Sequence, residues 1–304
     1  MAERRIRSIF IGSLGVRAGW RALLFMAVFA ILVTPLLFGL GWASRGLPTD
    51  LRLAALECGV LAAALAATWA LSRFERRRFS SFGLGGPGRL RNFVNGLAAG
   101  FGFLSLVIGL LTLTGAIRIG PLAQRGPGAA LWGAFWALVF VMVSFAEEML
   151  SRGYLLYALS QGIGFWPGAI ATSLLFGAAH VTNAGESAIG VTCATLIGLV
   201  NAYSLRWSGS LWWAIGLHTS WNWGETFFYG VSNSGQAVEH HLLSSAPIGP
   251  GWLSGGTVGP EGSALVFPVI VLLFASVRLT LTRASTPELD RPRRPTAPAA
   301  AHAS

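Results

Sequence analysis

The chain has 304 residues, of which 53% are hydrophobic and only 11% are charged. A soluble domain carries about a quarter charged residues, so this composition excludes an ordinary water-soluble globular protein. The formal net charge is +10 and every basic residue is Arg, standing between apolar stretches, which favours membrane topology over nucleic-acid binding. We therefore expect an all-α, polytopic membrane protein with about eight transmembrane helices around a central polar cavity.

In chain order, a basic segment (1–21) precedes a membrane domain (22–283). The first apolar stretch is longer than the roughly 7–15 residues of a signal-peptide core, so we predict an uncleaved span. The eight predicted spans are 22–43, 53–71, 94–115, 129–161, 167–184, 188–205, 210–230 and 263–281. The segment 231–262, rich in Gly, Ser and Pro, is predicted to be irregular, and the tail 284–304 to be disordered.

The distribution of Arg orients these spans. With the N-terminus in the cytoplasm, 17 Arg fall on the cytoplasmic side and four on the outer side, while Arg152 lies inside the fourth span. The positive-inside rule favours this orientation. We expect a multi-pass protein of the plasma membrane with both termini cytoplasmic, with membrane lipids among its partners and no nucleic acid.

The fourth span carries a charged patch in its middle. No Pro interrupts 129–161, so we predict one long, tilted helix; the alternative is a span that ends at residue 150, followed by a short interfacial helix. Glu148 and Arg152 stand at i, i+4 with the acid first, the favourable order for an ion pair within a helix. Glu147 points about 100° away around the helix and needs a partner from another helix.

Two His and one Asn supply such partners. His180 lies on the fifth span, and His218 and Asn222 lie one turn apart on the seventh. A lone His on an apolar helix is more often a satisfied core residue, but ionisable groups inside a membrane are costly and mark functional sites. At 1.5 Å per residue, these three groups and Glu147 lie about 12–21 Å from the cytoplasmic ends of their spans. We predict that they meet in one cavity.

Such a set fits hydrolysis of an amide bond. A carboxylate beside an imidazole can hold and deprotonate a water molecule. A second imidazole and a side-chain amide can donate hydrogen bonds to a developing oxyanion. No G-x-S-x-G is present, and Cys58 and Cys193, both within apolar spans, are predicted to be buried small hydrophobic residues without a disulfide or a zinc knuckle.

The motifs that carry these residues resemble a known family. E-E-M-L-S-R (147–152), F-G-A-A-H (176–180) and H-T-S-W-N (218–222) are similar in order and spacing to E-E-x-x-x-R, F-x-x-x-H and H-x-x-x-N. These mark the CPBP family of intramembrane glutamic endopeptidases, the group of CAAX prenyl protease 2 and the bacteriocin-processing Abi proteins. The resemblance covers roughly 129–230. One departure is Ser151, where many members have an aromatic residue.

The resemblance implies a peptidase and a role for each motif residue. Glu147 and His180 would activate the water, and His218 and Asn222 would form the oxyanion hole. Two further residues, Glu148 and Arg152, would order the site or bind substrate. The aromatic residue of the second motif, Phe176, would pack around His180. No cofactor is implied, and the substrate would be a CAAX-like protein, another membrane-anchored protein or a peptide.

Three alternatives stay open. A zinc-dependent intramembrane metalloprotease could use Glu147, His180 and His218 as three ligands with an open fourth position. A proton-coupled transporter could use the same groups as a proton relay. A non-catalytic immunity or scaffold protein is the third.

A few further positions carry minor expectations. Glu57 and Glu225 lie toward the outer ends of their spans and are expected to reach the interface. The adjacent histidines at 240–241 are expected to be solvated in the outer loop. Gly96 and Gly100 form a small-xxx-small pair that predicts close helix packing.

Overall fold

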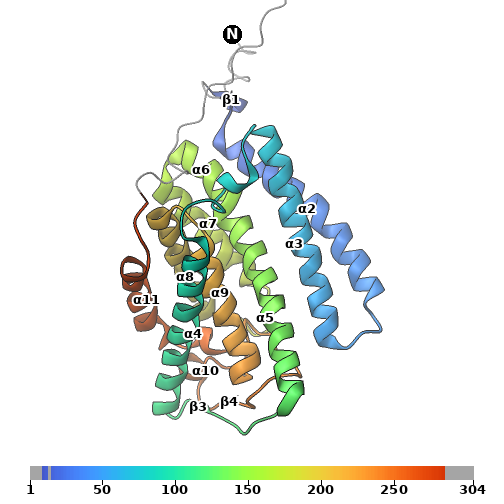
Figure 1. The fold of residues 1–304 in the computed structure, drawn as a ribbon, viewed down its shortest axis with the longest axis vertical. Helices are drawn as coiled ribbons and strands as arrows, with labels where there is room; N and C mark the ends of the chain where they lie inside the picture. The colour runs from blue at the N-terminus through green and yellow to red at the C-terminus, as the bar shows by residue number, and fades with distance from the viewer. Residues whose placement is uncertain (1–8, 13–14, 285–304) are drawn as a thin grey trace, which may run out of the picture.

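The structure, a computed structural model, describes residues 9–12 and 15–284. Figure 1 shows long helices that lie side by side, with two pairs of very short strands at opposite ends of the bundle. The helices are α2 (Ala18–Ala43), α3 (Thr49–Phe74), η1 (Phe79–Ser81), α4 (Arg89–Leu113), α5 (Gly126–Glu148), the π-helix η2 (Met149–Tyr154), α6 (Leu155–Ile163), α7 (Phe165–His180), α8 (Ala188–Ser208), α9 (Trp212–Trp223), the π-helix η3 (Gly224–Tyr229), α10 (Gly251–Ser254), η4 (Pro260–Gly262) and α11 (Val266–Thr280). The antiparallel strand pairs are β1 (Ile11–Gly12) with β2 (Gly15–Val16), and β3 (Ile117–Arg118) with β4 (Ala246–Pro247).

Each of the eight predicted spans contains a helix, which confirms an all-α, polytopic membrane protein. Among the described residues, five helical segments are long and apolar enough to cross a bilayer: α2, α3, α4, the continuous run Gly126–Ile163 and α8. The other three, α7, α9 and α11, have 16, 12 and 15 residues. They are shorter than the roughly 20 residues that a 30 Å hydrocarbon layer requires. The tail residues 285–304, predicted to be disordered, lie outside the described residues.

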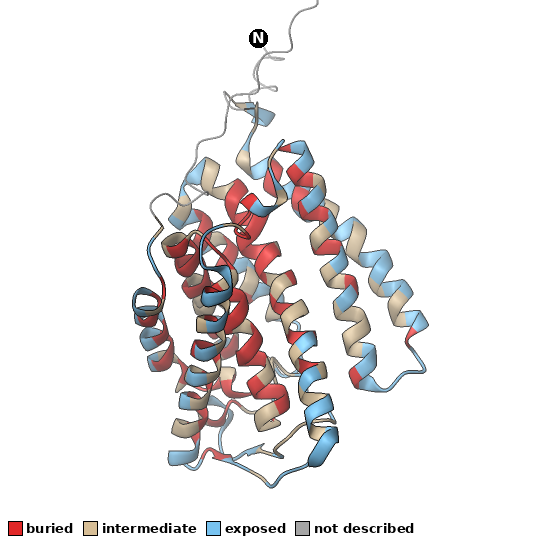
Figure 2. Ribbon diagram, viewed as in Figure 1, coloured by how far each residue is buried: buried red, intermediate tan, exposed pale blue. Residues whose placement is uncertain are grey.

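The outer helices carry their apolar side chains on the surface of the bundle. In α2, Leu23, Ile31 and Phe38 are 59%, 71% and 80% exposed. Figure 2 shows that buried residues concentrate in the group formed by α5 to α9, whereas α2 is largely exposed or intermediate. A helix that is apolar on its outward face is stable in contact with lipid, so this pattern agrees with the membrane interpretation.

The fourth predicted span is helical on both sides of a kink at Gly153. Helical residues follow one another for 38 positions through the charged patch, and no loop separates them. They nevertheless form two helices joined at a kink, the second being the nine-residue α6, so the structure lies between the two predictions. The kink arises because Gly153 has non-helical dihedral angles (φ −78°, ψ −107°) at the end of a π-helical turn. Such π-turns recur at functional sites. Here the turn contains Arg152, and α6 departs from it in a new direction.

Helices α4 and α9 pack with their backbones in contact. An added Cβ at Gly96 would collide with the carbonyl oxygen of Trp213, and one at Gly100 with that of Leu217. Gly216 on α9 meets the backbone of α4 in the same way. The small-xxx-small prediction for Gly96 and Gly100 is therefore confirmed, and this close contact fixes α9, which carries His218.

This contact makes a prediction on stability. Gly100→Ala should destabilise the protein by about 1–3 kcal/mol, because its methyl group has no space between α4 and α9. Gly102→Ala on the same helix is the matched control, since an added Cβ there meets nothing within 4 Å. Thermal unfolding of both variants in detergent checks the prediction, and equal unfolding midpoints would contradict the packing described.

A buried polar cluster joins the α2–α3 hairpin to α6. Arg21, only 2% exposed, pairs with Glu75 at 2.7 Å and donates to the carbonyl oxygen of Ala158 at 3.3 Å. The hydroxyl of Tyr154 donates to the same Glu75 oxygen at 2.9 Å. These bonds fix the hairpin against η2 and α6, and α3 consequently lies beside α5 with Glu57 facing the candidate site.

Candidate active site

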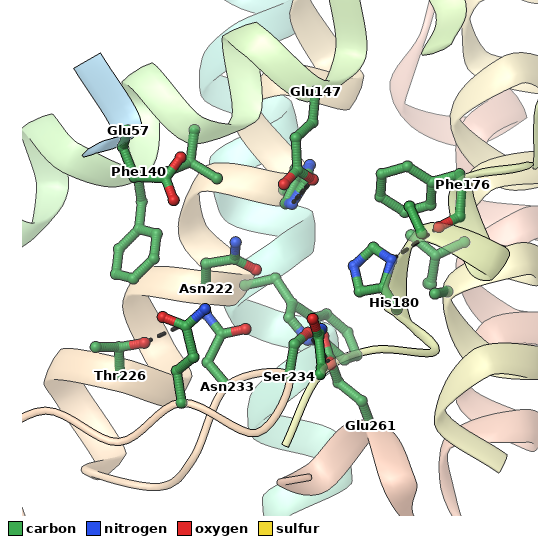
Figure 3. A pocket seen from close by; sticks show the side chains of 18 of the residues that line it. Glu57, Phe140, Glu147, Phe176, His180, Asn222, Thr226, Asn233, Ser234 and Glu261 are labelled. Carbon is green, nitrogen blue, oxygen red and sulfur yellow. Dashed lines mark hydrogen bonds and ion pairs between the residues drawn. The ribbon is translucent and has the colours of Figure 1, made fainter. Parts of the chain in front are cut away.

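A cavity of about 230 Å³ lies among the helices that carry the three motifs. It is lined by side chains of α3, α5, α7, α8 and α9, and by the segment 233–238 together with Glu261. Glu147, His180, His218 and Asn222 all line it, and Figure 3 shows that Glu147, His180 and Asn222 point into the same space from three different helices. The structure therefore brings together the four residues that were predicted to meet.

Glu148 and Arg152 form the ion pair expected from their spacing. Arg152 Nη1 lies 3.0 Å from Glu148 Oε1, and both side chains are completely buried. The guanidinium also lies over the ring of Phe176, 4.2 Å from its centroid, which is a favourable cation–π contact. Ser151 accepts a hydrogen bond from Arg152 Nη1 at 2.9 Å, so the residue that departs from the family pattern supplies a polar partner. The pair does not line the cavity but lies behind its wall.

His218 lies between two carboxylates. Its Nδ1 is 3.3 Å from Glu148 Oε1 and its Nε2 is 3.6 Å from Glu147 Oε2. Ionised carboxylates only accept hydrogen bonds, so both contacts favour the imidazolium form, with a proton on each ring nitrogen. His218 is thus held as a hydrogen-bond donor on the side that faces the cavity.

His180 is held in the opposite way. Its Nδ1 lies 2.8 Å from the carbonyl oxygen of Phe176, one turn earlier on α7. A carbonyl oxygen can only accept, so the proton of the neutral ring lies on Nδ1 and leaves a lone pair on Nε2. The ring of Phe176 packs 4.8 Å from that of His180, as predicted. His180 therefore presents a hydrogen-bond acceptor to the cavity, where His218 presents a donor.

Asn222 follows His218 by one helical turn and shares its face of α9. Its side chain is 7% exposed and, within the described part of the chain, makes no hydrogen bond. A buried amide without a partner is costly, so the site leaves its N–H groups available for a ligand.

Glu147 is more accessible than its neighbours His218 and Glu148. Its side chain is 33% exposed, compared with 13% for His218 and none for Glu148. A carboxylate that borders an open cavity can meet both water and substrate, whereas Glu148 can meet neither. The two adjacent glutamates are the same residue type, but only Glu147 is accessible from the cavity.

Three cavity residues were not predicted as site residues. Glu57 of α3 lines the cavity close enough to Glu147 for their charges to repel, so the expectation that it reaches the interface is wrong. Glu261 accepts a hydrogen bond from Ser234 at 2.8 Å, and burial raises the pKa of its carboxyl group. Asn201 of α8 lines the cavity and bonds Glu148 at 2.9 Å.

Other expectations from the sequence also need correction. Glu225 does not reach the interface but is completely buried and accepts a hydrogen bond from Trp221 Nε1 at 3.1 Å. Instead of being solvated, His240 lies 2.6 Å from Asp50 and stacks on Trp132. This contact ties the segment 231–262 to the start of α3.

The two cysteines differ from one another. Both are free; Cys193 is buried, as predicted, and lines the cavity. Cys58 is exposed on α3, so the prediction that it is a buried residue is wrong. Among the described residues, no three His, Cys, Asp or Glu side chains gather around one point as metal ligands would.

The fold and the cavity define a polytopic membrane protein with paired glutamates and two histidines inside its helix bundle. Residues 128–224 match the family model of the Rce1-like type II CAAX prenyl endopeptidases. The match contains Glu147, His180, His218 and Asn222, and it confirms the resemblance to the CPBP and CAAX protease family. Neither the curated proteins nor the solved structures contain a match to the chain. The family supports an intramembrane endopeptidase activity in general.

Proposed function

We propose that the chain is a glutamic-type intramembrane endopeptidase that cleaves a CAAX-like or other membrane-anchored substrate, or a peptide, without a metal. Glu147 and His180 activate the water, and His218 and Asn222 stabilise the oxyanion. The observation that carries the proposal is the opposite polarity of the two imidazoles. His180 presents an acceptor to the cavity and His218 a donor, because one ring is bonded to a carbonyl and the other lies between two carboxylates.

The reaction then follows from the placement of these groups. A water molecule transfers one proton to Glu147 and keeps the other, which it donates in a hydrogen bond to His180 Nε2, while its oxygen attacks the carbonyl carbon. As the C–O bond forms, the carbonyl oxygen becomes negative and accepts hydrogen bonds from His218 Nε2–H and the Asn222 amide. The C–N bond then breaks, and Glu147 returns the proton to the leaving nitrogen.

The two carboxylates beside His218 support its role as a hydrogen-bond donor. In the free cavity, its Nε2–H has Glu147 as a neighbour at 3.6 Å, longer than a normal hydrogen bond. A carbonyl oxygen that enters beside it can therefore take over this donor at little cost. The charged contact to Glu148 stays in place behind the ring and offsets the positive charge.

Cleavage of a peptide mixture by the purified protein tests the proposal. Asn222→Ala should lower the rate about 10²–10³-fold, because it removes one oxyanion donor. A chelator should change the wild-type rate little. Loss of activity in chelator that zinc restores would contradict the metal-free mechanism and favour Glu147, His180 and His218 as ligands.

We also propose that the protein lies in the plasma membrane with both termini in the cytoplasm, because 17 Arg then face inward and four outward. The segment 231–262, part of which lines the cavity, would then face outward. In a background without the two native cysteines, Ala246→Cys should react with an impermeant reagent in intact cells. Ser80→Cys, exposed between α3 and α4, should react only after permeabilisation. Labelling of both from outside would contradict this orientation.

A further inference from the structure

Asn201 is a buried amide on α8, a helix that carries none of the three motifs. It is 1% exposed, and its Nδ2 donates to Glu148 Oε1 at 2.9 Å. Its Oδ1 has no hydrogen-bond partner among the described residues. Burying an amide in an apolar helix costs free energy unless the amide forms a hydrogen bond. The bond to Glu148 therefore explains why an Asn can stand at this position.

Glu148 Oε1 collects three donors from three helical elements. Arg152 Nη1 lies 3.0 Å away and His218 Nδ1 3.3 Å away, in addition to the Asn201 amide. The other oxygen, Oε2, has no partner among the described residues. One oxygen of the carboxylate is therefore directed to His218 and the other is not.

Arg152 alone cannot impose that direction. It follows Glu148 by one turn on the same bent helix, and a single guanidinium nitrogen can bond either carboxylate oxygen. Asn201 approaches from α8, and its short side chain leaves it little freedom to follow a rotating carboxylate. The rotation of the Glu148 carboxylate is consequently set by a bond that comes from outside its own helix.

The face of α8 is shaped to receive the ion pair. Gly198 lies three residues before Asn201, and an added Cβ there would collide with Arg152 Nη2 and come within 3.1 Å of Ser173 Cβ. The missing side chain lets Arg152 lie against the helix, which places Glu148 within reach of Asn201. Asn201 and Gly198 thus act on one charged pair from the same helix face.

We infer that Asn201 is a positioning residue of the catalytic site: it fixes the carboxylate of Glu148 so that Glu148 keeps a proton on His218 Nδ1. Only with that proton in place, and a second one on Nε2, can His218 donate to an oxyanion. The inference rests on the proposed function, because the donor role of His218 is part of it. Asn201 itself touches neither the water nor the reacting carbonyl.

Asn201→Leu removes the amide but keeps the branched shape and the number of heavy atoms of the side chain. We expect kcat to fall roughly tenfold to a hundredfold, the range for a lost hydrogen bond to a charged group, while KM changes less than threefold. Asn95→Leu is the matched control, because it removes an interhelical bond of the same length, 2.9 Å, to Thr280 outside the cavity. It should keep the wild-type kcat.

A double-mutant cycle with Glu148 separates positioning from packing. In a Glu148→Gln background, Asn201→Leu should lower kcat less than threefold further, because the carboxylate it positions is already gone. An undiminished loss in that background would overturn the inference. Asn201→Ala, which also lacks the donor and adds no bulk, should lose a similar share of kcat and covers the case in which the leucine variant does not fold.

The measurements distinguish a failure of the proposed peptidase function from a failure of the positioning role of Asn201. A wild-type protein that cleaves no peptide would refute the proposed function. Active wild type with an unchanged kcat in Asn201→Ala, or with only a raised KM in Asn201→Leu, would overturn the positioning role. The second result would make Asn201 a substrate contact, since it lines the cavity.

Discussion

Glu147→Gln is expected to abolish peptide cleavage while leaving the protein folded. Glutamine has almost the same shape but cannot take a proton from water, and loss of a general base lowers rates about 10²–10⁴-fold. Glu147 is the carboxylate that both borders the cavity and stands beside an imidazole, with 33% of its side chain exposed. Its loss should therefore appear in kcat rather than in abundance or in the thermal unfolding midpoint.

Glu225→Gln is the matched control for this change. Glu225 is a buried acid of the same region, but its carboxyl group bonds Trp221 and does not line the cavity. A glutamine oxygen can accept the same bond, so cleavage should continue at the wild-type rate. Full activity in Glu147→Gln, measured with the purified protein, would end the glutamate-base mechanism. His180→Ala should lose more activity than Asn222→Ala, because His180 helps to hold the water itself.

The sequence predicted the polar set of the cavity because charge inside a membrane is conspicuous. Glu147, His180 and His218 interrupt apolar stretches, and each interruption is too costly to be accidental. Asn201 was missed because an amide is not ionisable and its helix carries no motif. Helix periodicity alone does not reveal that its donor meets Glu148, 53 residues earlier in the chain.

Glu57 shows a different limit of the sequence. Its place along the span suggested a side chain that reaches the interface. The direction in which it points depends on how the α2–α3 hairpin packs on the rest of the bundle, and that packing is set by Arg21, Glu75 and Tyr154. The contact between His240 and Asp50, 190 residues apart, is a tertiary contact of the same kind.

The bend in the fourth span could not be read from the residues either. Proline is the usual sign of a kink, and none occurs between residues 129 and 161. A glycine inside a helix permits a bend but does not require it. The non-helical angles of Gly153 and the π-turn before it follow from packing, whereas helical structure on both sides of the charged patch could be predicted.

Arg152→Ala is expected to lower the abundance of the protein as well as its activity. The change leaves Glu148 completely buried with an uncompensated charge, and breaking a buried pair on one side costs about 3–5 kcal/mol. Arg118→Ala, which removes an exposed arginine of β3, should leave abundance unchanged. Quantitative blotting of membranes and thermal unfolding in detergent measure both effects.

Replacing both Glu148 and Arg152 distinguishes the destabilisation caused by an unpaired buried charge from the loss of activity. A double variant, Glu148→Leu with Arg152→Leu, contains no uncompensated charge, so abundance should recover relative to Arg152→Ala. Activity should not recover, because His218 loses the carboxylate that holds the proton on its Nδ1. Normal abundance and full activity in Arg152→Ala would show that the two residues are not paired in the membrane. Recovery of both abundance and activity in the double variant would instead show that the pair has only a structural role. Glu147 alone would then orient His218.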